Sequence, residues 1–205
     1  EITRNHIGMV LVDLGGDLIC ESRKNCIYCN HSDYYRQLGS AVERFTQQSG
    51  IRCERIRYAG ISIPGILDRE KKAITDSHVL GLAHLDCAVF QENLPWQCSF
   101  ENDANAAGYA ELRDLPAEGT VVYLSLSNSV GGAIYQNGIL LPGNEERGGE
   151  FGHMRLKPEG RLCYCGQKGC VDAYCSALRL SGKADGNLER FFDGVNCKKP
   201  EFMAV

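Results

Sequence analysis

The sequence predicts a two-lobed α/β protein with a ligand cleft between its lobes. Short apolar runs typical of strands alternate with stretches of helical periodicity, and a polar break at residues 116–119 divides the pattern. A chain of 205 residues with 43% hydrophobic content can bury one substantial core or two small lobes. We therefore expect an N-terminal lobe over residues 1–115 and the start of a C-terminal lobe over residues 116–205.

The elements expected in the first lobe follow from local patterns. The apolar run at residues 7–13 indicates a strand, and Gly15 and Gly16 supply the turn into a second strand that begins at Leu18. Apolar side chains recur at helical spacing within residues 33–50, and Gly50 is a plausible stop. The other elements expected here are a strand over 56–62, a strand over 99–101 and an Ala-rich helix over 103–112.

The second lobe begins with two strands in a hairpin pattern. Residues 121–126 and 131–135 have strand character, and Asn137 with Gly138 forms a two-residue hairpin turn. Residues 199–205 have helical character. Because the first residues lie inside an expected strand and the last inside an expected helix, we expect further chain on each side.

Charge and hydropathy exclude several classes of partner. The net charge of −4 gives this stretch no electrostatic footprint for DNA or an anionic membrane. No run reaches the ~18 apolar residues of a membrane span, and the first residues lack the pattern of a signal peptide. We expect a cytoplasmic protein with no membrane partner.

Cysteine usage indicates reduced thiols. The eleven cysteines are an odd number, and no export signal accompanies them. Cys26 and Cys29 have the CxxC spacing of a metal or redox pair, but no second pair follows at zinc-site distance. Two incidental thiols are the default interpretation, and a metal or redox role is the alternative.

One cluster has the composition of a metal site. Three cysteines and a histidine lie close together in the sequence, which is the donor set of a closed tetrahedral zinc site with a structural role. Gly166 and Gly169 permit the tight reversals that such a knuckle needs. The alternative is a chance group of cysteines beside a core histidine. The predicted ligands are His153, Cys163, Cys165 and Cys170.

The motifs around this cluster resemble the signature of the ROK family, which contains sugar kinases and sugar-responsive transcriptional repressors. Residues 150–153 read EFGH and residues 163–172 read CYCGQKGCVD. Upstream, residues 101–107 (ENDANAA) resemble the catalytic-loop motif, residues 60–65 the G-x-x-x-P-G turn and residues 126–134 the second phosphate loop. The resemblance implies an actin-like ATPase, ribonuclease H-like fold with mixed sheets, an incomplete second lobe and a homo-oligomer.

The resemblance also implies a site for a monosaccharide or sugar derivative. Carboxylates accept from vicinal hydroxyls, and zinc would fix the position and tautomer of the histidine. The family's glutamate after the last cysteine is an aspartate here, which bears on sugar identity. Singly, these residues could also be a helix N-cap, a turn residue or a surface charge. The implied contacts are Asn102, Asp103, Glu150, His153 and Asp172.

The choice between a kinase and a regulator depends on the phosphate loops. Where ROK kinases carry D-x-G-G-T, residues 1–5 read EITRN, and where they carry G-T-G, residues 127–129 read SNS. Each lost glycine adds a Cβ where phosphates would lie, so ATP and magnesium are not expected. We therefore predict the sugar-binding effector domain of a ROK transcriptional regulator, which would reach DNA through a helix-turn-helix domain outside this sequence.

The alternative to a regulator is an ATP-dependent hexose or amino sugar kinase whose loops have drifted, with Asp103 as the general base. A third class, a scaffold protein, gives no reason for the polar cleft residues.

Overall fold

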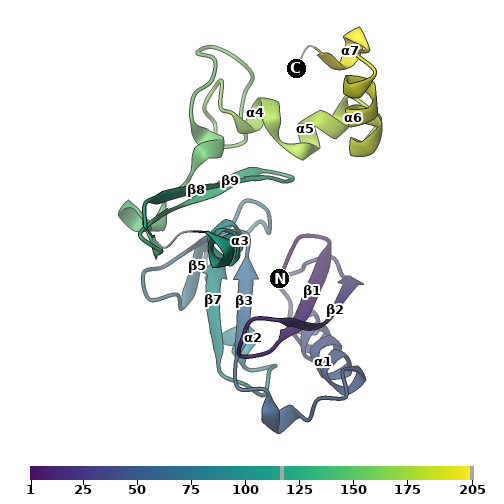
Figure 1. Cartoon of the computed structure of the whole chain (residues 1–205), viewed down its shortest axis with the longest axis vertical. Helices are drawn as coiled ribbons and strands as arrows, with labels where there is room; N and C mark the ends of the chain where they lie inside the picture. Colours follow the sequence, from purple (N-terminus) through teal and green to yellow (C-terminus); the bar gives the residue numbers. More distant parts are fainter. Residues whose placement is uncertain (116–117, 204–205) are drawn as a thin grey trace. The chain divides into compact units, whose positions relative to one another are not determined.

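The computed structural model describes residues 1–115 and 118–203 and divides into two compact units, Glu1–Ala106 and Ala107–Val205 (Figure 1). Helix α3 (Asp103–Glu111) begins in unit 1 and ends in unit 2. The other regular elements of unit 1 are β1 (His6–Val12), β2 (Leu18–Asn25), α1 (Ser32–Gln48), β3 (Ala59–Ile63), β4 (Ile66–Leu67), β5 (Ala73–Asp76), β6 (Leu85–Asp86), α2 (Ala88–Gln91) and β7 (Cys98–Asn102).

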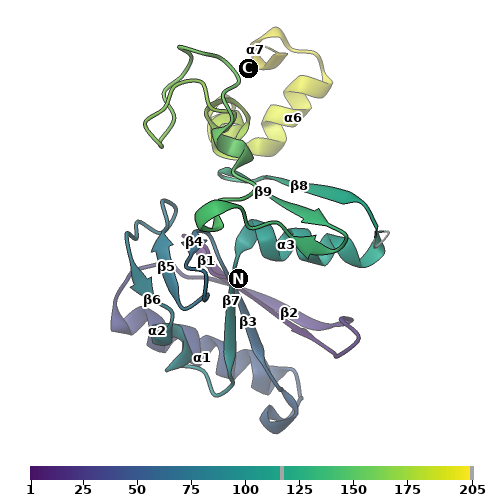
Figure 2. The ribbon, with the colours of Figure 1, turned by 90° about the vertical axis from the view of Figure 1, so that its left-hand side faces the viewer.

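Strands β1 and β2 form the expected antiparallel hairpin (Figure 2). The Asp13 carboxylate accepts hydrogen bonds from the backbone N–H groups of Gly15, at 2.8 Å, and Asp17, at 3.0 Å. Gly16 has φ 84°, a left-handed conformation that glycine adopts readily. The turn therefore forms where the sequence predicted it.

Helix α1 confirms the helix expected over residues 33–50. The His31 side chain accepts from the backbone N–H of Asp33 at the N-terminus, and Gly50 follows with φ 71°. Tyr35 and Leu38 face the core of unit 1, as the helical spacing requires.

Strands β3 and β7 pair in parallel from Ala59 opposite Cys98 to Ile63 opposite Asn102. The strand expected from residue 56 begins instead at Ala59, because a short 3₁₀ turn (Cys53–Arg55) precedes it. Parallel strands end at the same edge of a sheet. The end of β7 therefore lies beside the turn that follows β3.

The core of unit 1 joins helices and strands that are distant in sequence. Ile63, Ile74 and Phe90 have no measurable exposure, and the Phe90 and Tyr35 rings meet edge to face with centroids 5.1 Å apart. The small sheet of order β4-β5-β6 contributes Leu67 and Ile74 to this core. Sequence reasoning assigned none of these short strands, since two to four residues show no usable periodicity.

Over its described residues, unit 2 contains a three-stranded sheet of order β10-β9-β8 and, besides the end of α3, four short helices. The turn between β9 and β10 has positive φ at both Asn137 (51°) and Gly138 (77°), as the sequence predicted for a hairpin turn. The elements are β8 (Thr120–Leu126), β9 (Val130–Gln136), β10 (Ile139–Leu140), α4 (Asp172–Cys175), α5 (Ala177–Gly182), α6 (Leu188–Asn196) and α7 (Pro200–Met203).

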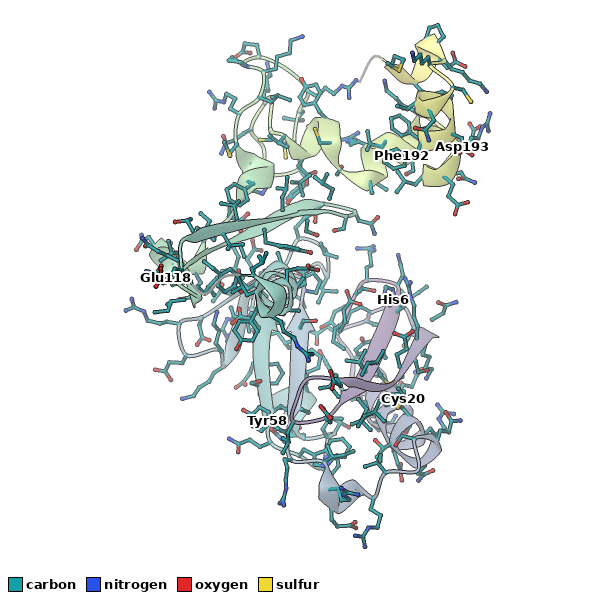
Figure 3. All side chains as sticks on the ribbon, viewed as in Figure 1. His6, Cys20, Tyr58, Glu118, Phe192 and Asp193 are labelled. Carbon is teal, nitrogen blue, oxygen red and sulfur yellow. The ribbon has the colours of Figure 1, made fainter. Side chains whose placement is uncertain are left out.

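Packing within unit 2 includes a close helix–sheet contact and a small aromatic cluster. A Cβ at Gly108 of α3 would lie 3.1 Å from side-chain atoms of both Tyr123 and Tyr135, so the helix approaches the sheet closely there. Farther along, Phe191 of α6 packs against Phe202 of α7 with ring centroids 5.8 Å apart, whereas Phe192 is exposed (Figure 3).

Helix α7 confirms the helical character expected at residues 199–205, of which 204 and 205 lie outside the described residues. Within the described ranges, no helix is both long enough and apolar enough to cross a bilayer.

We predict that a leucine-to-alanine substitution lowers the free energy of unfolding much more in the core of unit 1 than on its surface. Leu67→Ala, at a 2% exposed side chain, should lower the free energy of unfolding by about 2–5 kcal/mol because it opens a cavity. Leu14→Ala, at a fully exposed side chain, should change it by less than about 0.5 kcal/mol. Urea unfolding followed through the fluorescence of Trp96, the chain's one tryptophan, reports on unit 1. Equal losses for the two variants would contradict this core.

Candidate functional site

The predicted zinc ligands come together in unit 2. Each offers one ligand atom, and these atoms all lie within 4.8 Å of one another. Nδ1 of His153 is 3.8 Å from Sγ of Cys163, and the sulfurs of Cys165 and Cys170 are 3.7 Å apart. Ligands at zinc bond lengths of about 2.0–2.3 Å in a tetrahedron are separated by about 3.5–3.8 Å. The donor set and its spacing therefore fit a tetrahedral metal ion.

Glycines shape the loop that carries the cysteines. Gly166 has φ 85°, and its N–H donates to the carbonyl of Cys163 at 3.0 Å, which closes a tight turn between ligands. Gly169 has φ 83°, and a Cβ there would overlap the carbonyl oxygen of Lys157. The reversals that the sequence predicted at both glycines are confirmed.

The three thiols do not share one protonation behaviour. Burial raises the pKa of Cys163 to about 12 and also raises that of Cys170. Burial acts in the same direction on Cys165, but its pKa is lowered, because the backbone N–H of Gln167 and the neighbouring thiols donate to its sulfur. A bound cation is the physical means of stabilising all three thiolates together.

The two ring nitrogens of His153 face different groups. Nδ1 faces Cys163, whereas Nε2 lies 3.2 Å from the Tyr164 hydroxyl and 3.8 Å from a carboxylate oxygen of Glu150. A metal ion on Nδ1 would leave the ring proton on Nε2. The imidazole would then act as a hydrogen-bond donor on the side away from the metal.

A short 3₁₀ turn, Phe151–His153, positions this histidine. A Cβ at Gly152 would overlap the carbonyl oxygen of Val130, and a Cβ at Gly132 would overlap the Phe151 ring. These close contacts fix the turn against β9. Glu150 and His153 are thereby held within one turn of each other.

Asp172, the third predicted sugar contact in unit 2, lies just after the knuckle. Its side chain is buried, and one carboxylate oxygen accepts from the backbone N–H of Val130 at 2.6 Å. The N–H of Ala177 donates to the carbonyl of Ser127 at 2.7 Å. The segment that follows the knuckle is therefore bonded to both ends of the loop at residues 127–129.

Asn102 and Asp103 lie in unit 1, where β7 meets α3. The Asn102 side-chain oxygen accepts from the N–H groups of Ala104, at 2.9 Å, and Asn105, at 3.0 Å, and its amide donates to the carbonyl of Gly65 at 2.9 Å. Asn102 thus has the geometry of a helix N-cap. Asp103 begins the helix, with one carboxylate oxygen 2.9 Å from the N–H of Ala104.

Sequence reasoning missed two residues beside these predicted contacts. Glu101 accepts from the Lys71 ammonium at 3.2 Å, the N–H of Asn102 at 2.8 Å and the side chain of Asn105 at 3.1 Å. It stands in the ENDANAA motif, which was the available signal. Tyr164 lies between two predicted ligands, and no sequence signal indicated its contact with His153.

The two loops aligned with phosphate-binding motifs contain polar side chains. The hydroxyl oxygen of Thr3 accepts from the N–H groups of Asn5, at 3.3 Å, and His6, at 3.0 Å, while the exposed Arg4 guanidinium donates to the carbonyl of Val79. In the second loop, the Ser127 hydroxyl donates to the carbonyl of Ser129 at 3.1 Å. Side-chain donors therefore occupy the positions where the family has glycines.

Cys26 and Cys29 are free thiols, partly buried and exposed respectively. Their role in metal or redox chemistry stays a prediction.

The model of the ROK family matches residues 1–193. The chain belongs to the ROK family. It is 31% identical over 163 residues to the N-acetylmannosamine kinase of Escherichia coli (strain SMS-3-5 / SECEC), which covers 78% of this chain and 54% of the relative. The chain thus spans about half the length of the curated relatives it matches.

Two solved structures show the same fold. A ROK hexokinase from Thermus thermophilus matches with a TM-score of 0.74 and 26% identity, over 98% of this chain and 69% of that chain. A ROK family transcriptional regulator, a homolog of the E. coli MLC protein, matches with a TM-score of 0.75 and 22% identity, over 94% and 49%. The predicted actin-like α/β fold with mixed sheets is confirmed.

The comparisons contradict the prediction of a regulator's effector domain. The curated relatives are named N-acetylmannosamine kinases and the hexokinase is a sugar kinase, whereas the regulator at 22% identity shares the fold alone. That prediction equated missing glycines with lost phosphate binding. Glycine loss affects how closely a backbone can approach a phosphate, but each loop has a side chain with donor groups, Arg4 in the first and Ser127 in the second, which donate to backbone carbonyls in this structure. The findings favour the alternative prediction, a sugar kinase.

We predict that the carboxylate of Asp172 stabilises the first residue of β9. Asp172→Ala should leave the Val130 N–H without its buried acceptor and destabilise unit 2 by about 1–3 kcal/mol. Asp172→Asn keeps an acceptor of similar size and should retain most of the stability. Hydrogen exchange at the Val130 amide measures the difference. Equal protection in the wild type and Asp172→Ala would show that the carboxylate does not hold this strand.

Proposed function

We propose that the chain is part of an ATP-dependent ROK sugar kinase that phosphorylates a hydroxyl of a hexose or an N-acylated amino sugar. The observation that carries the proposal is the position of Asp103, which is the first residue of α3 and directly follows the capping residue Asn102. The chain that places it there is similar to N-acetylmannosamine kinases. A carboxylate fixed at a helix N-terminus suits a general base that must return to one position in each turnover.

Asp103 would take the proton from the attacking sugar hydroxyl. Asn102 supports it structurally, because two of its hydrogen bonds hold the first turn of α3 and the third joins it to the carbonyl of Gly65. General-base assistance is typically worth 10²–10⁴-fold in rate. Glu150, His153 and Asp172 stay proposed sugar contacts alongside Asn102 and Asp103, with acceptor oxygens and one imidazole donor suited to hydroxyl groups.

The nucleotide would be bound as ATP with magnesium. Arg4 and the serines of the 127–129 loop are the side chains that offer charge and hydroxyl donors at the family's phosphate loops. Positioning and charge stabilisation of the γ-phosphate supply most of the rate enhancement in phosphoryl transfer. These side chains would have to provide part of the phosphate binding that glycine loops provide in relatives.

A structural zinc ion fits the cluster in unit 2. The residues that would hold it are His153, Cys163, Cys165 and Cys170. When bound, zinc would order the knuckle and fix the tautomer of His153. His153 would then present its Nε2 proton to a sugar oxygen.

We predict that the full-length protein, expressed with ample metal, contains about one zinc ion per chain. Cys165→Ser should reduce the content several-fold, because a hydroxyl is a poor zinc ligand. Cys197→Ser is the matched control, since Cys197 is also exposed but lies at the end of α6. Elemental analysis measures both. Less than about a tenth of an equivalent in the wild type would contradict a zinc site.

We predict that the full-length protein with ATP, magnesium and its sugar turns over at ~1 s⁻¹ or more. Asp103→Asn should lower kcat by about 10²–10⁴-fold, because the amide cannot accept the proton. Asp193→Asn, at an exposed position on α6 (Figure 3), should leave kcat unchanged. A coupled assay for ADP release with N-acetylmannosamine, N-acetylglucosamine, glucose and mannose tests this. Absence of turnover with all four sugars would remove the kinase proposal.

A further inference from the structure

The turn between β4 and β5 carries a lysine in a conformation that suits glycine better. Asp68 holds this turn, because its carboxylate accepts from the N–H groups of Lys72, at 2.7 Å, and Ala73, at 3.0 Å. Its backbone carbonyl accepts from the N–H of Lys71 at 2.9 Å. Lys71 has φ 57°, in the left-handed region that glycine adopts with less strain. Any advantage of a lysine at this position therefore lies in its side chain.

The ammonium of Lys71 donates to the side chain of Glu101, at the end of β7. Nζ lies 3.2 Å from Oε1, and the two side chains are 26% and 34% exposed. The next lysine along the chain, Lys72, pairs instead with Glu70 at 2.6 Å, and those side chains are 75% and 70% exposed. Solvent therefore screens the attraction between Lys71 and Glu101 less than the attraction in the neighbouring pair.

The same oxygen of Glu101 is bonded to the start of α3. Oε1 accepts from the backbone N–H of Asn102 at 2.8 Å and from the side-chain amide of Asn105 at 3.1 Å. Asn102 immediately precedes Asp103, and Asn105 lies two positions after it. One carboxylate oxygen thus joins Lys71 to residues on both sides of the proposed general base.

We infer that the ion pair of Lys71 with Glu101 positions the carboxylate of Asp103 for proton transfer. The inference rests on the proposed kinase function, in which Lys71 and Glu101 are positioning residues. Without the ammonium, the Glu101 side chain is held less firmly, and so are its two hydrogen bonds to the start of α3. A general base must lie within hydrogen-bond reach of the hydroxyl, and a displacement of about 1 Å can cost about 10²-fold in rate.

A pair that only stabilised unit 1 would act differently from one that positions the base. Loss of a purely stabilising pair would reduce the fraction of folded protein, and turnover would fall by the same factor with or without a base at residue 103. Loss of a positioning pair would have no further effect once Asp103→Asn has removed the base. Residues that act as one catalytic unit show this kind of non-additivity.

The test measures kcat of the full-length protein with ATP, magnesium and a saturating concentration of a sugar that the wild type phosphorylates. Lys71→Met removes the ammonium, and Lys72→Met is the matched control at the adjacent exposed pair. Lys71→Gly also removes the ammonium but suits the left-handed turn, whereas Lys71→Arg keeps a cation. The substitutions at Lys71 are repeated in the Asp103→Asn background. Urea unfolding followed through Trp96 checks the fold of unit 1 in every variant.

We expect Lys71→Met and Lys71→Gly each to lower kcat about 10-fold, while Lys71→Arg stays within about threefold of the wild type and Lys72→Met leaves kcat unchanged. In the Asp103→Asn background, the same substitutions at Lys71 should change the residual turnover less than about twofold. An unchanged kcat in Lys71→Met and Lys71→Gly, or an equal loss in both backgrounds, would overturn the inference while leaving the kinase established. A wild type that phosphorylates none of the four sugars would instead remove the proposed function, and the inference with it.

Discussion

The knuckle in unit 2 depends on bringing three sulfurs and an imidazole within 4.8 Å of one another. Hydrophobic burial contributes little there, because the local cluster consists of two of the ligand cysteines and Ala173, with Tyr174 packed against it. Raised pKa values at Cys163 and Cys170 oppose the loss of their protons. A divalent cation, if bound there as proposed, would offset that cost and supply the order that so small a core cannot.

The parts of the structure that could be predicted from sequence have local causes. The β1–β2 hairpin has turn glycines, α1 has helical spacing, and the residues of the metal-site cluster lie within one short segment. The parts that could not be predicted depend on long-range contacts. The bond from Val130 to Asp172 joins residues 42 positions apart, and the parallel pairing of β3 with β7 places Gly65 beside Asn102. No motif in the sequence indicates that the two partners of either contact lie close together.

The difference between local patterns and long-range contacts also explains why the prediction of a regulator was wrong. A missing glycine is a local observation, and it correctly indicates that a Cβ occupies space near a backbone. Whether phosphate binding is lost depends on which donors the folded loop offers instead. The second loop has serine hydroxyls, and the first has an arginine whose guanidinium already reaches a backbone carbonyl in another segment of unit 1. Neither arrangement follows from counting glycines.

Within unit 2, the proposed metal ligands, the proposed sugar contacts and the loop at residues 127–129 form one connected structure. Asp172 lies two residues after Cys170, and its carboxylate accepts a hydrogen bond from the backbone N–H of Val130. The backbone N–H of Ala177 donates to the carbonyl of Ser127. The turn that carries Glu150 and His153 is fixed against the same strand, because Gly152 allows the approach to Val130. Substitutions at these places share partners, so their effects on stability should not add. A substitution in the knuckle can therefore alter the loop at residues 127–129 directly through these hydrogen bonds. No separate conformational switch is needed for that effect.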